Sequence, residues 1–115
     1  QQTKKIIVQI FNSFKNLVQV YESGQDFVVL DTETSGLNYR SDYIIEIGAI
    51  KFNKDGIKKE KFNSLIKIPI QLDPIITNLT GIKDEDLYSN GKEITSVLDD
   101  FLNYSQQTKK RETDA

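Results

Sequence analysis

A short apolar run that ends in two carboxylates and a glycine is the feature that most constrains the fold of this chain. It reads Phe27-Val-Val-Leu-Asp31-Thr-Glu33-Thr-Ser-Gly36. Val, Val and Leu between polar residues predict a short buried strand, and the glycine predicts its end. Because residues i and i+2 of a strand point to the same face, Asp31 and Glu33 are predicted to project side by side from the end of a core strand.

The spacing of these two carboxylates also has a chemical meaning. Two like charges held this close repel each other unless a cation lies between them. Carboxylate oxygens suit Mg²⁺ or Mn²⁺, which are hard ions that dehydrate reluctantly and take few protein ligands. The pair is therefore interpreted as the first half of a two-metal phosphoryl-transfer site. The simpler alternative is a strand end whose acids face water.

The segments after this run predict two more strands. Residues 43–53 form an apolar, strand-like run, and residues 57–68 form a third candidate with a less regular pattern. Asn53-Lys-Asp-Gly56 separates them, and an Asp-Gly pair favours a hairpin because the turn needs positive φ. The three strands are predicted to form an antiparallel meander.

Helices are predicted on both sides of this meander. Residues 4–22 repeat apolar side chains at helical spacing and stop at Ser23-Gly24. This helix could pack on the sheet, join a partner or be the tail of an upstream domain, and packing on the sheet is the preferred interpretation. Asp73-Pro74 predicts an N-cap and first helical position. A short helix is predicted to open at 83–87, and 93–104 predicts an amphipathic helix that covers the sheet.

Three segments together show a family resemblance: Asp31-Thr-Glu33-Thr-Ser-Gly36-Leu37, Ile44-Ile-Glu46-Ile-Gly48-Ala49 and Leu79-Thr80-Gly81-Ile82. In this order and approximate spacing they resemble the DnaQ-like branch of the DEDD exonucleases, which proofread DNA or trim DNA and RNA ends from 3′ to 5′. The resemblance covers roughly residues 27–102. It implies an α/β, ribonuclease H-like fold in incomplete form: an N-terminal helix, a three-stranded antiparallel meander with the first strand central, and then helices.

The resemblance also implies roles for five residues. Asp31 would bridge two Mg²⁺ or Mn²⁺ ions, and Glu33 would bind the ion nearer the nucleophilic water. Thr34 and Leu37 would contact the terminal nucleotide, and Thr80 matches a position near the sugar or base of that nucleotide. The implied substrate is the 3′ end of DNA or RNA, and a DNA polymerase subunit is a possible partner.

Three residues inside the matching segments are assigned structural roles instead. Glu46 lies in an apolar strand, so it is predicted to be a buried, hydrogen-bonded acid rather than a metal ligand. Gly48 and Gly81 are predicted to serve backbone conformation rather than the site.

The sequence departs from the family after the first motif. The family's other two acidic ligands and the His or Tyr that activates water have no counterpart, and the chain contains no histidine. We therefore expect the N-terminal part of an exonuclease, inactive in this form. A degenerate module that binds nucleic-acid ends or a polymerase is the main alternative, and a site completed by another chain is the third.

Composition sets the remaining expectations. The 115 residues divide into a predicted helix over 1–25, a partial exonuclease domain over 26–104 and a polar, disordered tail over 105–115. A net charge of −2 argues neither for nor against nucleic-acid binding. Without cysteine, signal core or apolar membrane span, the cytoplasm is the predicted location and no membrane partner is expected.

Overall fold

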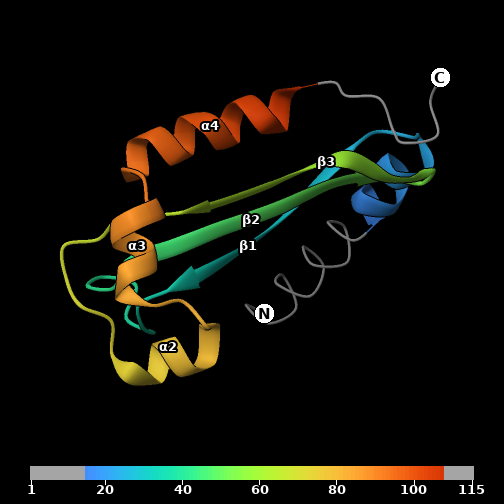
Figure 1. Cartoon of the computed structure of the whole chain (residues 1–115). Helices are drawn as coiled ribbons and strands as arrows, with labels where there is room; N and C mark the ends of the chain where they lie inside the picture. Colours follow the sequence, from blue (N-terminus) through green and yellow to red (C-terminus); the bar gives the residue numbers. More distant parts are fainter. Residues whose placement is uncertain (1–14, 108–115) are drawn as a thin grey trace, which may run out of the picture.

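A three-stranded sheet and three short helices form the body of the molecule (Figure 1). The computed structural model describes residues 15–107, of which 15–22 are helical. The strands and helices after this segment are β1 Phe27–Thr34, β2 Ile44–Asn53, β3 Gly56–Leu65, α2 Pro74–Thr80, α3 Asp84–Asn90 and α4 Ile94–Gln106. The predicted helix over 4–22 is confirmed for 15–22, and its first part lies outside the described residues.

The sheet is the predicted antiparallel meander, with strand order β1-β2-β3. β2 and β3 are joined by the predicted hairpin, in which Asn53 pairs with Gly56 and the glycine takes a φ of 134°. Only glycine adopts such a backbone readily, which explains the glycine at this turn. The α/β fold predicted from the sequence is thus confirmed.

β3 is shorter than predicted, because it ends at Leu65 rather than at residue 68. Ile66 instead forms a parallel bridge with Lys92, and the Lys67 amide donates to the Lys92 carbonyl at 2.9 Å. The chain therefore leaves the antiparallel ladder to meet the segment just before α4. Pro69, which lacks an amide donor, comes shortly after.

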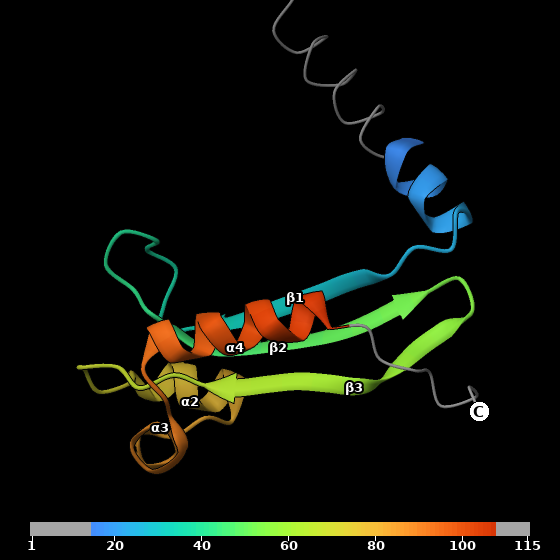
Figure 2. The same ribbon diagram turned by 90° about the horizontal axis from the view of Figure 1, so that it is seen from above.

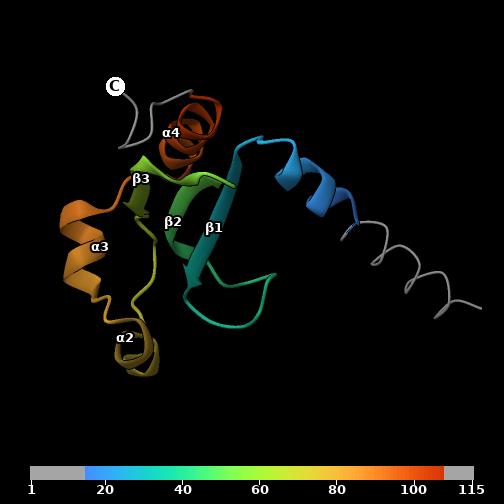
Figure 3. The same cartoon turned by 90° about the vertical axis from the view of Figure 1, so that its right-hand side faces the viewer.

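The core lies between one face of the sheet and the helices. Alternate residues of β2 are buried, as expected for a strand with one covered face. Two clusters fill this space: Ile45 with Leu72, Ile82 and Leu87, and Ile47 with Ile66 and Val97. Figures 1 and 3 show α4 running along this face, with α2 and α3 at the end of the sheet where β2 begins.

A buried lysine fastens the end of α4 to the sheet. Lys51 is only 2 % exposed, and its Nζ donates to the carbonyls of Tyr104 at 2.5 Å and Gln107 at 2.6 Å. The same ammonium lies 4.7 Å from the centroid of the Tyr104 ring. A cation at the C-terminal end of a helix is favourable because the free carbonyls there carry partial negative charge. α4 includes Ser105 and Gln106, which were predicted to belong to the polar tail.

β1 differs from its prediction. Val29 and Leu30 are 50 % and 52 % exposed, so the strand is not buried. In the described part of the chain β1 pairs only with β2, which places it at an edge of the sheet rather than in the centre. Figure 2 shows its outer side facing away from β2 and β3. The apolar composition of β1 predicted a strand correctly but could not report which neighbours cover it.

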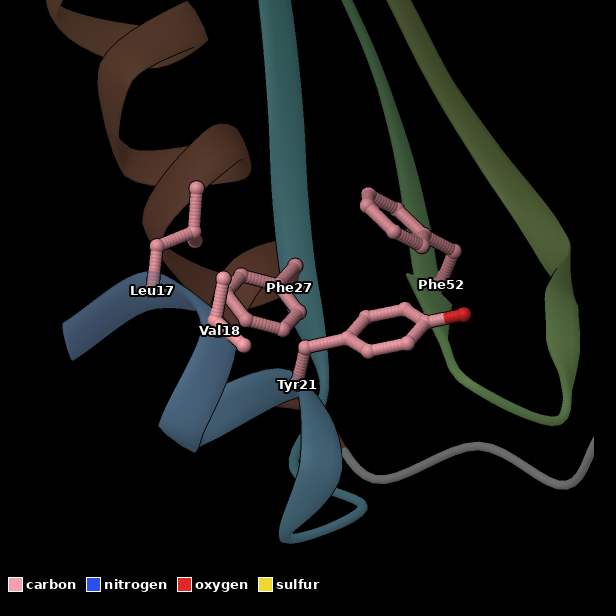
Figure 4. Close-up of a pocket in the computed structure, with 5 residues that line it drawn as sticks. All are labelled: Leu17, Val18, Tyr21, Phe27 and Phe52. Carbon is pink, nitrogen blue, oxygen red and sulfur yellow. The ribbon is translucent and has the colours of Figure 1, made fainter. Parts of the chain in front are cut away.

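The helical segment 15–22 packs at the far end of β1. The Tyr21 and Phe27 rings lie 6.4 Å apart, and Phe27 stacks on Phe52 of β2 at 5.6 Å. Together with Leu17 and Val18 these rings line an apolar hollow of about 270 Å³ (Figure 4). The helical segment thus meets the sheet through the Tyr21 and Phe27 rings. Leu17, Val18 and Tyr21 remain 50 %, 44 % and 39 % exposed, so packing of the whole predicted helix on the sheet stays a prediction.

Candidate functional site

The two carboxylates singled out in the sequence lie on the open face of the sheet. Asp31 pairs with Gly48 and Glu33 pairs with Glu46 across the β1–β2 ladder. Directly paired residues share a face, and their neighbours in sequence point to the other. Ile47, on that other face, packs against Val97 of α4. Asp31 and Glu33 therefore project from the face that α4 does not cover, with Asp31 exposed and Glu33 half-buried.

Glu46 brings a third carboxylate to the same face. It lies directly opposite Glu33 and accepts a hydrogen bond from the Asn63 side-chain amide at 3.2 Å. The predicted hydrogen bond is confirmed, but the predicted burial is wrong, because Glu46 is only half-buried on this uncovered face. Like charges directly opposite each other on a sheet are destabilising, so a cation between the strands would relieve the repulsion between this pair.

A shallow hollow of about 370 Å³ lies beside Asp31. Its lining comes from all three strands: Val29, Asp31, Gly48, Ala49, Ile50, Lys61, Phe62 and Asn63. Gly48 is the residue directly across from Asp31, and its backbone does not take positive φ. The prediction that it serves backbone conformation is therefore wrong, and it contributes open space beside the carboxylate instead. Gly81 does take a φ of 78° at the end of α2, as predicted.

The loop after β1 is held by Asp42, a residue that the sequence analysis missed. One carboxylate oxygen of Asp42 accepts from the Ser35 hydroxyl at 2.9 Å, and the other accepts from the Asn38 amide at 2.8 Å. The Ser35 hydroxyl in turn accepts from the Tyr43 amide at 2.9 Å. These loop contacts join residues four, seven and eight positions apart, and no apolar periodicity signals them. The only sequence feature that could have predicted these hydrogen bonds is a Ser and an Asp on either side of a polar loop.

The remaining predicted substrate residues occupy different settings. Thr34 ends β1, and its hydroxyl donates to the Gly36 carbonyl at 2.7 Å. Leu37 lies in the loop and is fully exposed, at 104 % of the reference area. Thr80 is on α2, where its hydroxyl donates to the Ile76 carbonyl and accepts from the Ile82 amide. Thr34 thus lies on the same strand as Asp31 and Glu33. The Thr80 hydroxyl instead makes hydrogen bonds to the backbone at the end of α2.

The carboxylate groups on the open face offer oxygen atoms as metal ligands, and oxygen ligands suit a hard divalent cation. Within residues 15–107, however, no group of three or more His, Cys, Asp or Glu side chains is arranged to hold a metal ion. Asp31 and Glu33 therefore offer oxygen atoms of the kind such an ion takes, but fewer than a complete ligand set. In the same part of the chain, no helix is long and apolar enough to cross a membrane.

Comparison with known proteins identifies the class. Residues 28–113 match the sequence model of a family described as exonuclease, the RNase T family. The match spans well over half of the chain, and the chain belongs to this family, in agreement with the DnaQ-like resemblance of its motifs.

The relatives include DNA polymerase III proteins. The chain is 40 % identical over 82 residues to the PolC-type DNA polymerase III of Thermotoga petrophila, covering 71 % of this chain and 6 % of the relative. It is 34 % identical over 82 residues to the DNA polymerase III subunit epsilon of Treponema pallidum, covering 71 % and 37 %. The chain thus spans well under half the length of these relatives.

Solved structures show the same fold. The chain superimposes on E. coli exonuclease I in complex with a 5cy-dT13 oligonucleotide with a TM-score of 0.62 and 18 % identity, covering 70 % of this chain and 18 % of that one. A product-bound structure of exonuclease I gives a TM-score of 0.63 at the same identity, with 70 % and 19 % covered. At this identity the likeness establishes the ribonuclease H-like fold.

Proposed function

We propose that this chain provides the N-terminal part of a divalent-metal-dependent 3′-5′ exonuclease domain that hydrolyses the terminal phosphodiester of DNA or RNA. The observation that supports this most is the placement of Asp31 and Glu33 on one open sheet face, inside the segment that matches the exonuclease family. The named relatives are DNA polymerase III proteins, which supports a nucleic-acid 3′ end as substrate, a polymerase as possible partner and a cytoplasmic location.

Asp31 and Glu33 are the residues that would hold Mg²⁺ or Mn²⁺. Bound divalent ions lower the pKa of a water molecule and stabilise a departing oxygen in phosphoryl transfer. The protein's own part is to fix the two carboxylates on the ladder, where Gly48 leaves space next to Asp31. Thr34, Leu37 and Thr80 are proposed to contact the terminal nucleotide, with the exposed Leu37 side chain placed against its base.

The same residues support an incomplete site. Two carboxylates do not make a full ligand set, and within residues 15–107 no further acidic side chain joins them in a metal-binding group. The chain has no histidine to serve as general base. We therefore propose that the 115-residue chain is inactive as a nuclease.

Paramagnetic Mn²⁺ tests the metal site without requiring activity. In ¹⁵N-labelled protein, Mn²⁺ should broaden the amide signals around Asp31, Glu33 and Glu46 before those of other acidic segments. Asp31→Asn should abolish this preference. Glu85→Gln, which removes an exposed carboxylate on α3, is the matched control and should leave it unchanged. Broadening centred on α3, or unaffected by Asp31→Asn, would overturn the proposed site.

A nuclease assay tests the proposed inactivity. A single strand labelled at its 3′ end should release no nucleotide in the presence of this chain and Mg²⁺ or Mn²⁺. Release that Asp31→Ala abolishes would contradict the proposal and would favour a site completed by a second chain. Release that Asp31→Ala leaves unchanged would indicate a contaminating nuclease.

A further inference from the structure

The loop between β1 and β2 presents an unusual group of exposed side chains. Leu37 is 104 % and Tyr39 is 85 % exposed, and Arg40 beside them is also exposed. Figure 2 shows this loop leaving the end of β1 and extending past the edge of the sheet, away from β3. An apolar, an aromatic and a cationic side chain are thus directed to solvent next to the proposed site.

Tyr39 and Arg40 form a defined pair. The Arg40 guanidinium carbon lies 5.5 Å from the centroid of the Tyr39 ring, and Arg40 Nε donates to the Tyr39 hydroxyl at 3.1 Å. A planar ring with an adjacent guanidinium offers an aromatic surface for stacking a base and a positive charge for a phosphate. Such stacking tolerates any base, because every base has a π face.

The backbone beneath this pair is fixed by hydrogen bonds. The Asn38 amide donates to Asp42, the Arg40 amide donates to the Asn38 side-chain oxygen at 3.0 Å, and the amides of Ser41 and Asp42 donate to the Asn38 carbonyl. A loop ordered in advance loses less conformational entropy when it binds a ligand. The loop therefore presents Tyr39 at a settled position despite its exposure.

We propose that Tyr39 and Arg40 form a stacking site for a base of single-stranded nucleic acid, next to the nucleotide that Leu37 contacts. The assignment of the strand's 3′ end to the Asp31 side rests on the proposed function. The stacking itself requires no metal, so the two proposals can fail separately. The chemistry favours a single strand because the bases of a duplex are stacked on each other and do not offer their faces.

Tyr88 provides a matched control within the same chain. It is 81 % exposed, and Lys67 Nζ lies 5.9 Å from the centroid of its ring. It belongs to α3, which Figure 3 shows beside β3, on the opposite side of the sheet from β1. Tyr39 and Tyr88 therefore share exposure and a neighbouring cation but differ in their distance from the proposed site.

The test is a titration of the ¹⁵N-labelled chain with a five-nucleotide thymidine strand in EDTA. The amide signals of Leu37, Tyr39 and Arg40 should shift together. Tyr39→Ala should weaken binding roughly fivefold or more, as expected for the loss of one base stack. Tyr39→Phe should keep the affinity, because the ring is retained, and Tyr88→Ala should not change it.

Several outcomes would overturn the proposal. These are an absence of shifts in the loop, equal losses from Tyr39→Ala and Tyr88→Ala, or tighter binding of the corresponding duplex. A positive titration combined with a failed Mn²⁺ experiment would retain the stacking site and replace the exonuclease proposal by a module that binds nucleic-acid ends. A positive Mn²⁺ experiment combined with a failed titration would keep the proposed metal site and overturn the stacking site at Tyr39 and Arg40.

Discussion

The two faces of the sheet perform different tasks with the same three strands. On the face under α4, Ile45, Ile47 and Val97 are almost fully buried, and even a lysine is enclosed. On the other face, Asp31, Glu33 and Glu46 share the surface with half-exposed apolar residues. Because successive residues of β2 alternate between the faces, one strand supplies both a core and a charged surface. Neighbouring residues of β2 therefore serve different purposes: one belongs to the core that stabilises the fold, and the next belongs to the face of the proposed site.

The largest expected effect is a contrast between two isoleucines. Ile45→Ala should lower the free energy of unfolding by about 2–5 kcal/mol, because a fully buried side chain leaves a cavity in the core. Ile57 is 57 % exposed and pairs with Phe52, a residue of the open face. Ile57→Ala should cost less than about 1 kcal/mol. Urea denaturation followed by circular dichroism measures both, and equal losses would contradict the division between the faces.

Two lysines offer the same contrast for charge. Lys51→Met should cost about 1.5–3 kcal/mol, since it leaves the carbonyls of Tyr104 and Gln107 without their charged donor. Lys61 is exposed and pairs with Ile50 on the open face. Lys61→Met should change the unfolding free energy by no more than about 0.5 kcal/mol. If Lys51→Met proved neutral, the buried ammonium would not be fastening α4.

Tyr104 sharpens the comparison through pH. Burial, and secondarily the negative charge of Glu60, raise the pKa of Tyr104 above the ordinary value of 10.0. The folded state therefore keeps its phenol proton at a pH where the unfolded chain has lost it. This contribution to stability is fully present below pH 10.0 and declines as the pH rises above that value.

A spectroscopic titration checks this expectation. Absorbance at about 295 nm follows tyrosinate formation, and a late component from Tyr104 should appear above pH 10.0. Tyr104→Phe should remove that late component. It should also cost about 1 kcal/mol at neutral pH, because the hydroxyl donates to the Glu60 carbonyl at 3.0 Å. If the late component remained in Tyr104→Phe, it would come from a different tyrosine, and the expectation would be wrong.

The smallest expected effect concerns the open face itself. Glu46→Gln removes the like charge opposite Glu33 and keeps an oxygen for the Asn63 amide. In EDTA the variant should be more stable than the parent by roughly 0.2–1 kcal/mol. Added Mg²⁺ should narrow this gap, since a cation relieves the repulsion in the parent. Thermal unfolding with and without Mg²⁺ provides the measurement, and a destabilised variant in EDTA would show that the two carboxylates do not repel.

Much of the fold could be predicted from local patterns in the sequence. The Asp-Gly hairpin formed as predicted, and Asp73 caps α2 by accepting from the Ile75 amide at 2.9 Å. The amphipathic run that became α4 was placed within two residues at its end. These features depend on a few neighbouring residues, so their signals are short-range and legible in one sequence.

The errors arose where distant parts of the chain decide the outcome. Val29 and Leu30 look like core residues, but their burial depends on which elements flank β1. The end of β3 is set by the bridge to Lys92, far along the chain. Within the candidate site, the adjacency of Asp31 and Glu33 could be read from strand alternation, whereas the contribution of Gly48 required the register between β1 and β2. Periodicity describes a segment and does not identify its partner.

Gly36 and Asp42, in the loop after β1, constrain the history of the sequence as well as its shape. A Cβ atom added to Gly36 would lie 2.5 Å from an oxygen of the Asp42 carboxylate, which two donors already hold in place. A side chain at the first position therefore requires a different residue at the second. Across diverging descendants of this domain, a side chain at position 36 should therefore appear only where position 42 has also changed.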